Sequence, residues 1–180
     1  MPKTKRDYDT RIEKEVGAFL DEYFYSKDFI TDFKRFDDEN QQISGMDVRF
    51  TWGGLENILV DEKAQSDYIN KMLPTFAFEI DFINRAGNLS QGWLFDESKK
   101  TQYYLLNWIN AEKTSGITVK DINGLGCLLL NRQKIIKFLE DQGLTKDKVK
   151  RISANIRKSG VKGRHEVGAY DSCYFYYTMK

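Results

Sequence analysis

The sequence has 180 residues, of which 41% are hydrophobic and 31% are charged, and its formal net charge is +1. This composition is typical of a globular domain with a buried core and excludes a disordered chain. Cys127 and Cys173 are too few and too far apart for a disulfide framework or a zinc site. No apolar stretch is long enough for a membrane span or a signal peptide. We therefore expect residues 1–180 to form a single cytoplasmic domain without membrane contact.

The charge is distributed unevenly along the chain. Residues 132–164 carry eleven Lys or Arg against three Asp or Glu, so this segment is basic and the remainder is acidic. Such asymmetry is typical of a protein that binds a phosphate backbone beside a metal site, although a pair of solvated surface helices is an equally open alternative. The residues expected to contact nucleic acid are Lys148, Lys150, Arg151, Arg157, Lys158, Lys162 and Arg164.

The first element predicted is an amphipathic helix over residues 8–25, because its apolar residues recur every three or four positions. Residues 29–36 follow as a strand candidate, and the polar residues 37–40 predict a turn. The apolar positions of the helix are Ile12, Val16, Phe19, Leu20, Tyr23 and Phe24.

Short segments rich in apolar and β-forming residues come next. We expect strands at residues 46–50, 57–63 and 75–83, with Gly53-Gly54 as a tight turn between the first two. Residues 102–109 are apolar enough for a central strand. The first half of the chain is therefore predicted to be a helix followed by a β-meander.

Beyond residue 111 the pattern changes to strand, helix, helix, strand. Residues 125–130 predict a buried strand, and residues 132–142 predict a helix that ends at Gly143. Thr145 is the expected N-cap of a second helix, and residues 172–178 are expected to form the last strand. These elements predict an α/β (α+β) fold with a strand-helix-helix-strand elaboration at its C-terminal end.

Two carboxylates and one lysine in the sequence indicate a specific chemistry. Side chains alternate along a strand, so Asp61 and Lys63 share one face and Glu62 points to the other. If the strands that carry Asp47 and Asp61 pair through Gly53-Gly54, the two carboxylates lie side by side. Their repulsion favours a hard divalent cation such as Mg²⁺, whose remaining ligands are water and phosphate oxygens. The set therefore predicts metal-assisted hydrolysis of a phosphodiester bond.

The tripeptide of an acidic residue, any residue and a lysine is not specific by itself. It also occurs at Asp32-Phe33-Lys34 and Glu97-Ser98-Lys99. Only the Asp61 copy ends an apolar strand and follows a Gly-X-Asp element by one hairpin. The alternative interpretation is that Asp61 and Lys63 form a surface ion pair and that Asp47 caps a turn.

The set of Asp47, Asp61 and Lys63 resembles the motif of the PD-(D/E)XK nuclease superfamily, which includes type II restriction enzymes and archaeal Holliday-junction resolvases. In that family the first acidic residue lies on the second core strand, and the acidic-X-Lys element lies on the next strand. The resemblance covers residues 1–65 in motif and residues 1–110 in architecture. The sequence departs from the family pattern at Gly45-Met46, where a proline is usual.

Many members add a glutamate on the first helix, and some add a glutamine two residues after the lysine, which Gln65 matches. Between Glu13 and Glu15 we prefer Glu13 for the first role, because helical geometry places it at the border of the apolar stripe, between Leu20 and Phe24. The resemblance thus implies a Mg²⁺ site, which Mn²⁺ could also fill, formed by Glu13, Asp47 and Asp61, with Lys63 and Gln65 at the scissile phosphate.

The resemblance also implies a restriction-endonuclease-like core with a mixed central β-sheet in residues 1–110, and a basic elaboration in residues 111–180. The expected activity is cleavage of DNA, with RNA not excluded, and a homodimer is plausible because one small site cuts one strand. A first alternative is a phage or mobile-element scaffold that binds nucleic acid or a host protein without cutting it. A second alternative is a structural protein whose acidic residues are only surface charge.

The remaining candidates are weaker. His165 is the only histidine, so a histidine-dependent nuclease or a His-ligated zinc site is not expected. Gln42 and Glu79 could join the site, but a glutamine in a turn and a solvent-facing glutamate are the simpler interpretations. Trp52 is the tryptophan expected to be exposed near the site, where it could stack on a base.

Overall fold

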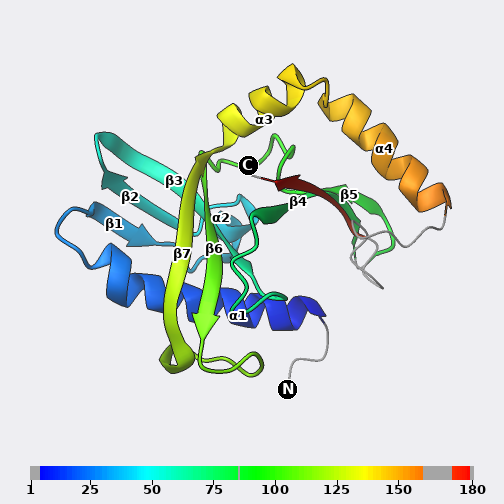
Figure 1. Ribbon diagram of the computed structural model, residues 1–180. Coiled ribbons are helices and arrows are strands. Elements are labelled where there is room, and N and C mark those ends of the chain that lie inside the picture. Colours follow the sequence, from blue (N-terminus) through cyan, green and yellow to red (C-terminus); the bar gives the residue numbers. More distant parts are fainter. Residues whose placement is uncertain (1–4, 85, 160–171, 179–180) are drawn as a thin grey trace. The chain divides into compact units, whose positions relative to one another are not determined.

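The computed structural model describes residues 5–84, 86–159 and 172–178 (Figure 1). The chain forms two compact units, of which the first contains Met1–Leu73 and Lys100–Asn131 and the second contains Pro74–Lys99 and Arg132–Lys180. The second unit is therefore formed by one segment that interrupts the first unit and one that follows it. This division differs from the expected boundary at residue 110. Within the described ranges, no helix has the length and apolar content needed to cross a bilayer.

The first unit is built on a mixed sheet, as the resemblance implied, and this sheet has five strands. Their spatial order is β1-β2-β3-β6-β7, in which β3 and β6 are parallel and all other neighbours are antiparallel. The central position predicted for β6 is confirmed, whereas β7 is an edge strand whose side chains are mostly only partly buried, which corrects the prediction of a buried strand. The strands are β1 (Thr31–Arg35), β2 (Val48–Trp52), β3 (Leu55–Gln65), β6 (Tyr103–Ala111) and β7 (Ile122–Asn131).

The N-terminal helix predicted from periodicity is confirmed. Helix α1 (Lys5–Leu20) continues directly into a π-helical turn, η1 (Asp21–Tyr25). Its apolar stripe contributes Ile12, Val16 and Leu20 to the hydrophobic core of the first unit. This packing fixes the side of the sheet on which α1 lies.

Two short helical segments complete the first unit. Helix α2 (Glu39–Ile43) occupies part of the region predicted as a turn, because the Asp38 carboxylate accepts hydrogen bonds from the backbone N–H groups of Asn40 and Gln41 and caps the helix. A 3₁₀ turn, η2 (Val119–Asp121), leads into β7.

The strand register divides the side chains of the sheet between two faces. Val48 pairs with Val60, and both belong to the core that includes α1. The neighbouring pair of Arg49 and Leu59 must then point to the other side, because side chains alternate along a strand. We call the side of Arg35, Val48, Val60 and Glu62 the helix face, and the side of Lys34, Arg49, Leu59, Asp61 and Lys63 the far face.

The second unit contains an antiparallel sheet in which β4 (Thr75–Ile83) lies between β5 (Leu89–Gln91) and β8 (Ser172–Thr178). The predicted strands at residues 75–83 and 172–178 are therefore confirmed. The expectation that the first of them extends the meander is wrong, because β3 already pairs with β2 on one side and β6 on the other.

Both predicted C-terminal helices are present, as α3 (Arg132–Asp141) and α4 (Lys146–Ser159). Gly143 adopts a φ of +73° just after α3, which is the left-handed conformation that ends many helices. The hydroxyl of Thr145 accepts a hydrogen bond from the Lys148 N–H at 3.3 Å, so the predicted N-cap of α4 is also confirmed.

Candidate functional site

Asp47 and Asp61 lie side by side at the adjoining ends of β2 and β3. The Asp47 N–H donates to the Val60 carbonyl oxygen at 3.0 Å, and the Asp47 Oδ2 accepts from the Glu62 N–H at 2.7 Å. These two bonds hold Asp47 against β3, where its carboxyl group also shares a hydrogen bond with that of Asp61. The antiparallel pairing through Gly53 and Gly54 therefore brings the two carboxyl groups together, as the sequence predicted.

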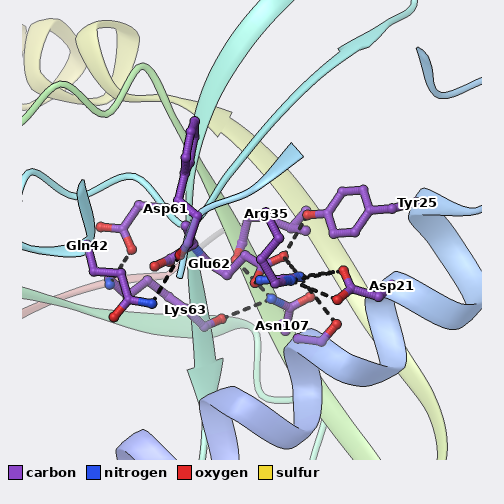
Figure 2. Close-up of polar contacts among 12 residues, drawn as sticks. Asp21, Tyr25, Arg35, Gln42, Asp61, Glu62, Lys63 and Asn107 are labelled. Carbon is purple, nitrogen blue, oxygen red and sulfur yellow. Dashed lines mark hydrogen bonds and ion pairs between the residues drawn. The ribbon is translucent and has the colours of Figure 1, made fainter. Parts of the chain in front are cut away.

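Lys63 completes this group from the same strand face. Its ammonium group forms an ion pair with the Asp61 carboxylate, and the Asp61 side chain is only 5% exposed. Figure 2 shows both residues together with their neighbours on β3. The alternative of a surface ion pair does not describe this contact, because burial removes most of the solvent that would screen it.

The site has unusual electrostatics. Burial and the neighbouring charge of Asp47 raise the pKa of Asp61 to about 8, although the ammonium of Lys63 acts in the opposite direction. Burial alone would lower the pKa of Lys63, but the carboxylates of Asp61, Glu13 and Asp47 raise it above its ordinary value. A divalent cation would relieve this arrangement, because it would favour the ionised form of Asp61 beside Asp47.

Of the two glutamates considered on α1, Glu13 is the one near this group. The Glu13 side chain is exposed, yet the protein around its carboxyl group disfavours the charged form and raises its pKa to about 7, with Lys63 opposing and Asp47 adding to the shift. Glu15 has a different role, because its Oε2 accepts a hydrogen bond from the Val119 N–H at 2.7 Å. The preference for Glu13, which was based on helical geometry, therefore agrees with its electrostatic interaction with Lys63.

A partly buried network on the helix face supports the strand that carries the site. Arg35 donates to Glu62 Oε2 at 2.8 Å and binds both carboxylate oxygens of Asp21, and the Tyr25 hydroxyl donates to Glu62 Oε1 at 2.7 Å (Figure 2). The network joins η1 and β1 to the residue between Asp61 and Lys63. The sequence analysis missed it, because no local pattern links residues so far apart in the chain.

Asn107 is a second supporting residue that the sequence analysis missed. It is fully buried on β6, and its Nδ2 donates to the carbonyl oxygens of Lys63 at 3.2 Å and Leu105 at 2.9 Å. Its Oδ1 accepts a hydrogen bond from the Cys127 thiol at 3.2 Å. The signal in the sequence that could have identified Asn107 is a polar asparagine within a predicted apolar strand.

Four further candidates are placed as follows. Gln65 lies on β3 two residues after Lys63 and is partly buried. Gln42 is exposed on the short helix α2, not in the turn expected for it, and it donates to the Phe36 carbonyl oxygen at 3.1 Å. Trp52 is 37% exposed at the opposite end of β2 from Asp47, and its ring contacts Phe24 and Phe29. Glu79 belongs to β4 in the second unit.

The expected nucleic-acid-binding residues divide into three groups. The Arg157 guanidinium forms an ion pair with Asp81 at 2.5 Å, so the Asp81 carboxylate of the second unit already neutralises much of its charge. Lys162, Arg164 and also His165 lie outside the described residues. The other four expected residues, Lys148, Lys150, Arg151 and Lys158, are exposed on α4.

Within residues 5–84, 86–159 and 172–178, no group of three histidine, cysteine or acidic side chains is arranged to hold a metal ion. The structure therefore gathers two of the three expected ligands, Asp47 and Asp61, and leaves Glu13 outside that pair. Two carboxylates are a common protein contribution to a Mg²⁺ site, since water and phosphate oxygens supply the rest.

Comparison of the chain with family models, with curated proteins and with solved structures found no match.

Proposed function

We propose that the protein is a metal-dependent nuclease that hydrolyses phosphodiester bonds in DNA, with its active site at Asp47, Asp61 and Lys63. The observation that carries this proposal is the contact between the Asp47 and Asp61 carboxyl groups beside the Lys63 ammonium. A pair of carboxyl groups of which one keeps its proton to about pH 8 is costly to maintain, and such pairs are concentrated at functional sites.

The order of the elements adds support. Asp47 directly precedes β2, Asp61 and Lys63 lie on the next strand, β3, and Glu13 lies on the first helix. The resemblance to the PD-(D/E)XK nuclease superfamily places the two acidic residues, the lysine and the glutamate on these same elements. A restriction-endonuclease-like core is therefore part of the proposal.

Each residue receives a role from its chemistry. Asp47 and Asp61 would hold Mg²⁺ or Mn²⁺, which supplies Lewis-acid activation of the phosphodiester and of a water molecule. Lys63 stabilises negative charge that develops on the scissile phosphate, and Gln65 donates to a phosphate oxygen or orients the attacking water. Glu13 interacts electrostatically with Lys63 and favours its protonated form.

The test is cleavage of DNA by the purified protein. With Mg²⁺ or Mn²⁺ it should cut duplex, single-stranded or branched DNA, and Lys63→Ala and Asp61→Asn should each lower the rate at least about a hundredfold, because each removes a charge that acts on the transition state. Circular dichroism and thermal unfolding should show that both variants remain folded.

Asp32→Asn is the matched control, because Asp32-Phe33-Lys34 repeats the tripeptide outside the site. Asp32 has a φ of +53°, a conformation that asparagine also adopts readily, so this variant should fold and cut like the unchanged protein. Absence of cleavage on all three DNA forms with both metals would contradict the proposal. DNA binding that persists without cleavage, also in Asp61→Asn, would favour the alternative of a non-cutting scaffold.

A further inference from the structure

Arg49 lies on the same side of the sheet as the acidic pair. Arg49 lies on β2, two residues after Asp47. It pairs with Leu59 on β3, and Leu59 lies two residues before Asp61. Diagonal neighbours of this kind have Cα atoms about 7–8 Å apart. The Arg49 side chain therefore starts close to the proposed site, within the same compact unit.

The Arg49 side chain has no protein partner among the described residues. Its Nε atom is buried and forms no hydrogen bond, although the side chain as a whole remains partly accessible. A guanidinium nitrogen in this state is unfavourable, because a buried donor that lacks an acceptor loses its hydration without compensation. The donor is therefore available to an acceptor that is not part of the described chain.

The cross-strand neighbour of Arg49 is also basic. Arg49 pairs with Lys34 on β1, and both side chains lie on the far face. The Lys34 side chain is exposed, with its ammonium 5.3 Å from the centre of the Phe36 ring. Two cations in neighbouring strands thus continue from the carboxylates toward the β1 edge of the sheet.

We propose that Arg49, with Lys34 beside it, binds the phosphodiester group next to the one that is cleaved, so that the nucleic-acid strand crosses the far face from β3 toward β1. Arginine suits this role because its planar guanidinium offers several donors to one phosphate. The inference rests on the proposed nuclease function, since it defines the path of the same substrate. It also places a phosphate contact in the first unit, separate from the basic helix α4.

The experiment measures DNA affinity without cleavage. Fluorescence anisotropy of a labelled DNA duplex, in buffer with EDTA and over a series of salt concentrations, compares the unchanged protein with Arg49→Gln, Arg49→Lys and Lys34→Gln. Arg49→Gln should weaken binding about tenfold, the order expected for the loss of one charged hydrogen-bonded contact. It should also reduce the slope of log K against log salt by about 0.9, which is the value for one phosphate contact.

Lys27→Gln is the control that removes the same charge elsewhere. Lys27 is exposed in the turn between η1 and β1, so this variant should bind DNA like the unchanged protein. Arg49→Lys should recover part of the affinity, and Lys34→Gln should lower the slope with a smaller loss of affinity. Thermal unfolding should show that Arg49→Gln is as stable as the unchanged protein, because it removes an unsatisfied donor.

The outcomes separate this inference from the proposed function. A protein that binds DNA but does not cut it, with weaker binding in Arg49→Gln, would leave the Arg49 contact standing and overturn the nuclease. A protein that cuts DNA, with the same affinity and salt slope in Arg49→Gln as in the unchanged chain, would overturn the Arg49 contact alone. Absence of any DNA binding, or an equal loss of affinity in Lys27→Gln, would also overturn it.

Discussion

The backbone N–H of Glu62 donates a hydrogen bond of 2.7 Å to the Asp47 carboxylate, and this bond fixes the first acidic position of the site to the strand that carries the second. The same residue uses its side chain on the opposite face of the sheet, where it binds Arg35 and Tyr25. Glu62 therefore connects the acidic pair to the interior of the first unit. The residue between the aspartate and the lysine of the motif has a structural role of its own.

The stability of the metal-free protein should decrease as the pH rises. The pKa of Asp61 is raised to about 8 and that of Glu13 to about 7, so the folded protein binds more protons than the unfolded chain between about pH 4 and pH 8. The stabilisation is complete below the unfolded pKa values and is lost as the pH rises through the folded ones. The buried Asp61 contributes a slope of at most about 1.4 kcal/mol per pH unit, and the exposed Glu13 contributes less because solvent screens its charge.

Urea unfolding in EDTA at about pH 5, 6, 7 and 8 measures this slope. Asp61→Asn should make the dependence shallower, since asparagine does not titrate in this range. A stability that rises over the same interval would show that the two carboxyl groups are not held in their protonated forms.

Divalent cations should raise the melting temperature of the unchanged protein. A cation that binds only the folded form at a hundred times its Kd stabilises by about 2.7 kcal/mol, which corresponds to about 5–10 °C for a chain of this length. The shift should be larger at about pH 8 than at pH 6, because cations compete with protons for the carboxylates. Thermal unfolding with Mg²⁺, Mn²⁺ and Ca²⁺ measures it.

Asp47→Asn and Asp61→Asn should each abolish most of this shift, and Asp32→Asn should retain it in full. An equal shift in all three variants would mean that the cation binds elsewhere on the chain. No shift with any of the three cations in the unchanged protein would contradict a metal site at Asp47 and Asp61.

The adjacency of Asp47 and Asp61 could be predicted because it depends on short-range rules. Two apolar segments joined by Gly53-Gly54 form a hairpin, and the glycines adopt φ values of +59° and +80° that a tight turn requires. Once the hairpin is assumed, the alternation of side chains places Asp61 and Lys63 on one face. The choice of Glu13 over Glu15 likewise required only the geometry of one helix.

The parts that could not be predicted depend on contacts between distant segments. Arg35 and Glu62 are 27 positions apart, and neither residue carries a local signal for the other. The exclusion of β4 from the first sheet depends on β6, which returns to pair with β3 after an intervening segment. Periodicity identifies such strands, but it does not determine which edge of a sheet remains available to them.

Gly92→Ala should destabilise the second unit. A Cβ atom at Gly92 would lie 2.4 Å from the Glu79 carbonyl oxygen and 2.7 Å from the Ile80 carbonyl carbon, and backbone atoms cannot move aside as a flexible side chain would. The expected cost is about 1–3 kcal/mol, as for other overpacked sites, and chemical unfolding measures it. Gly124→Ala is the control, because a Cβ atom there has no neighbour within 4 Å. Equal stability of both variants would contradict the close approach at Gly92.

Arg35 and Glu62 should stabilise the folded protein cooperatively, so that the effects of removing each residue do not add. Arg35→Met leaves the Glu62 carboxylate, which is only 8% exposed, without its cation, and the expected loss of stability is about 3–5 kcal/mol. Glu62→Gln should cost less, since the amide can still accept from the Tyr25 hydroxyl. The double variant should be less destabilised than the sum of the two single variants, because it removes both charges together. Urea unfolding of the four proteins gives the coupling energy, and a value near zero would show that the two residues contribute independently.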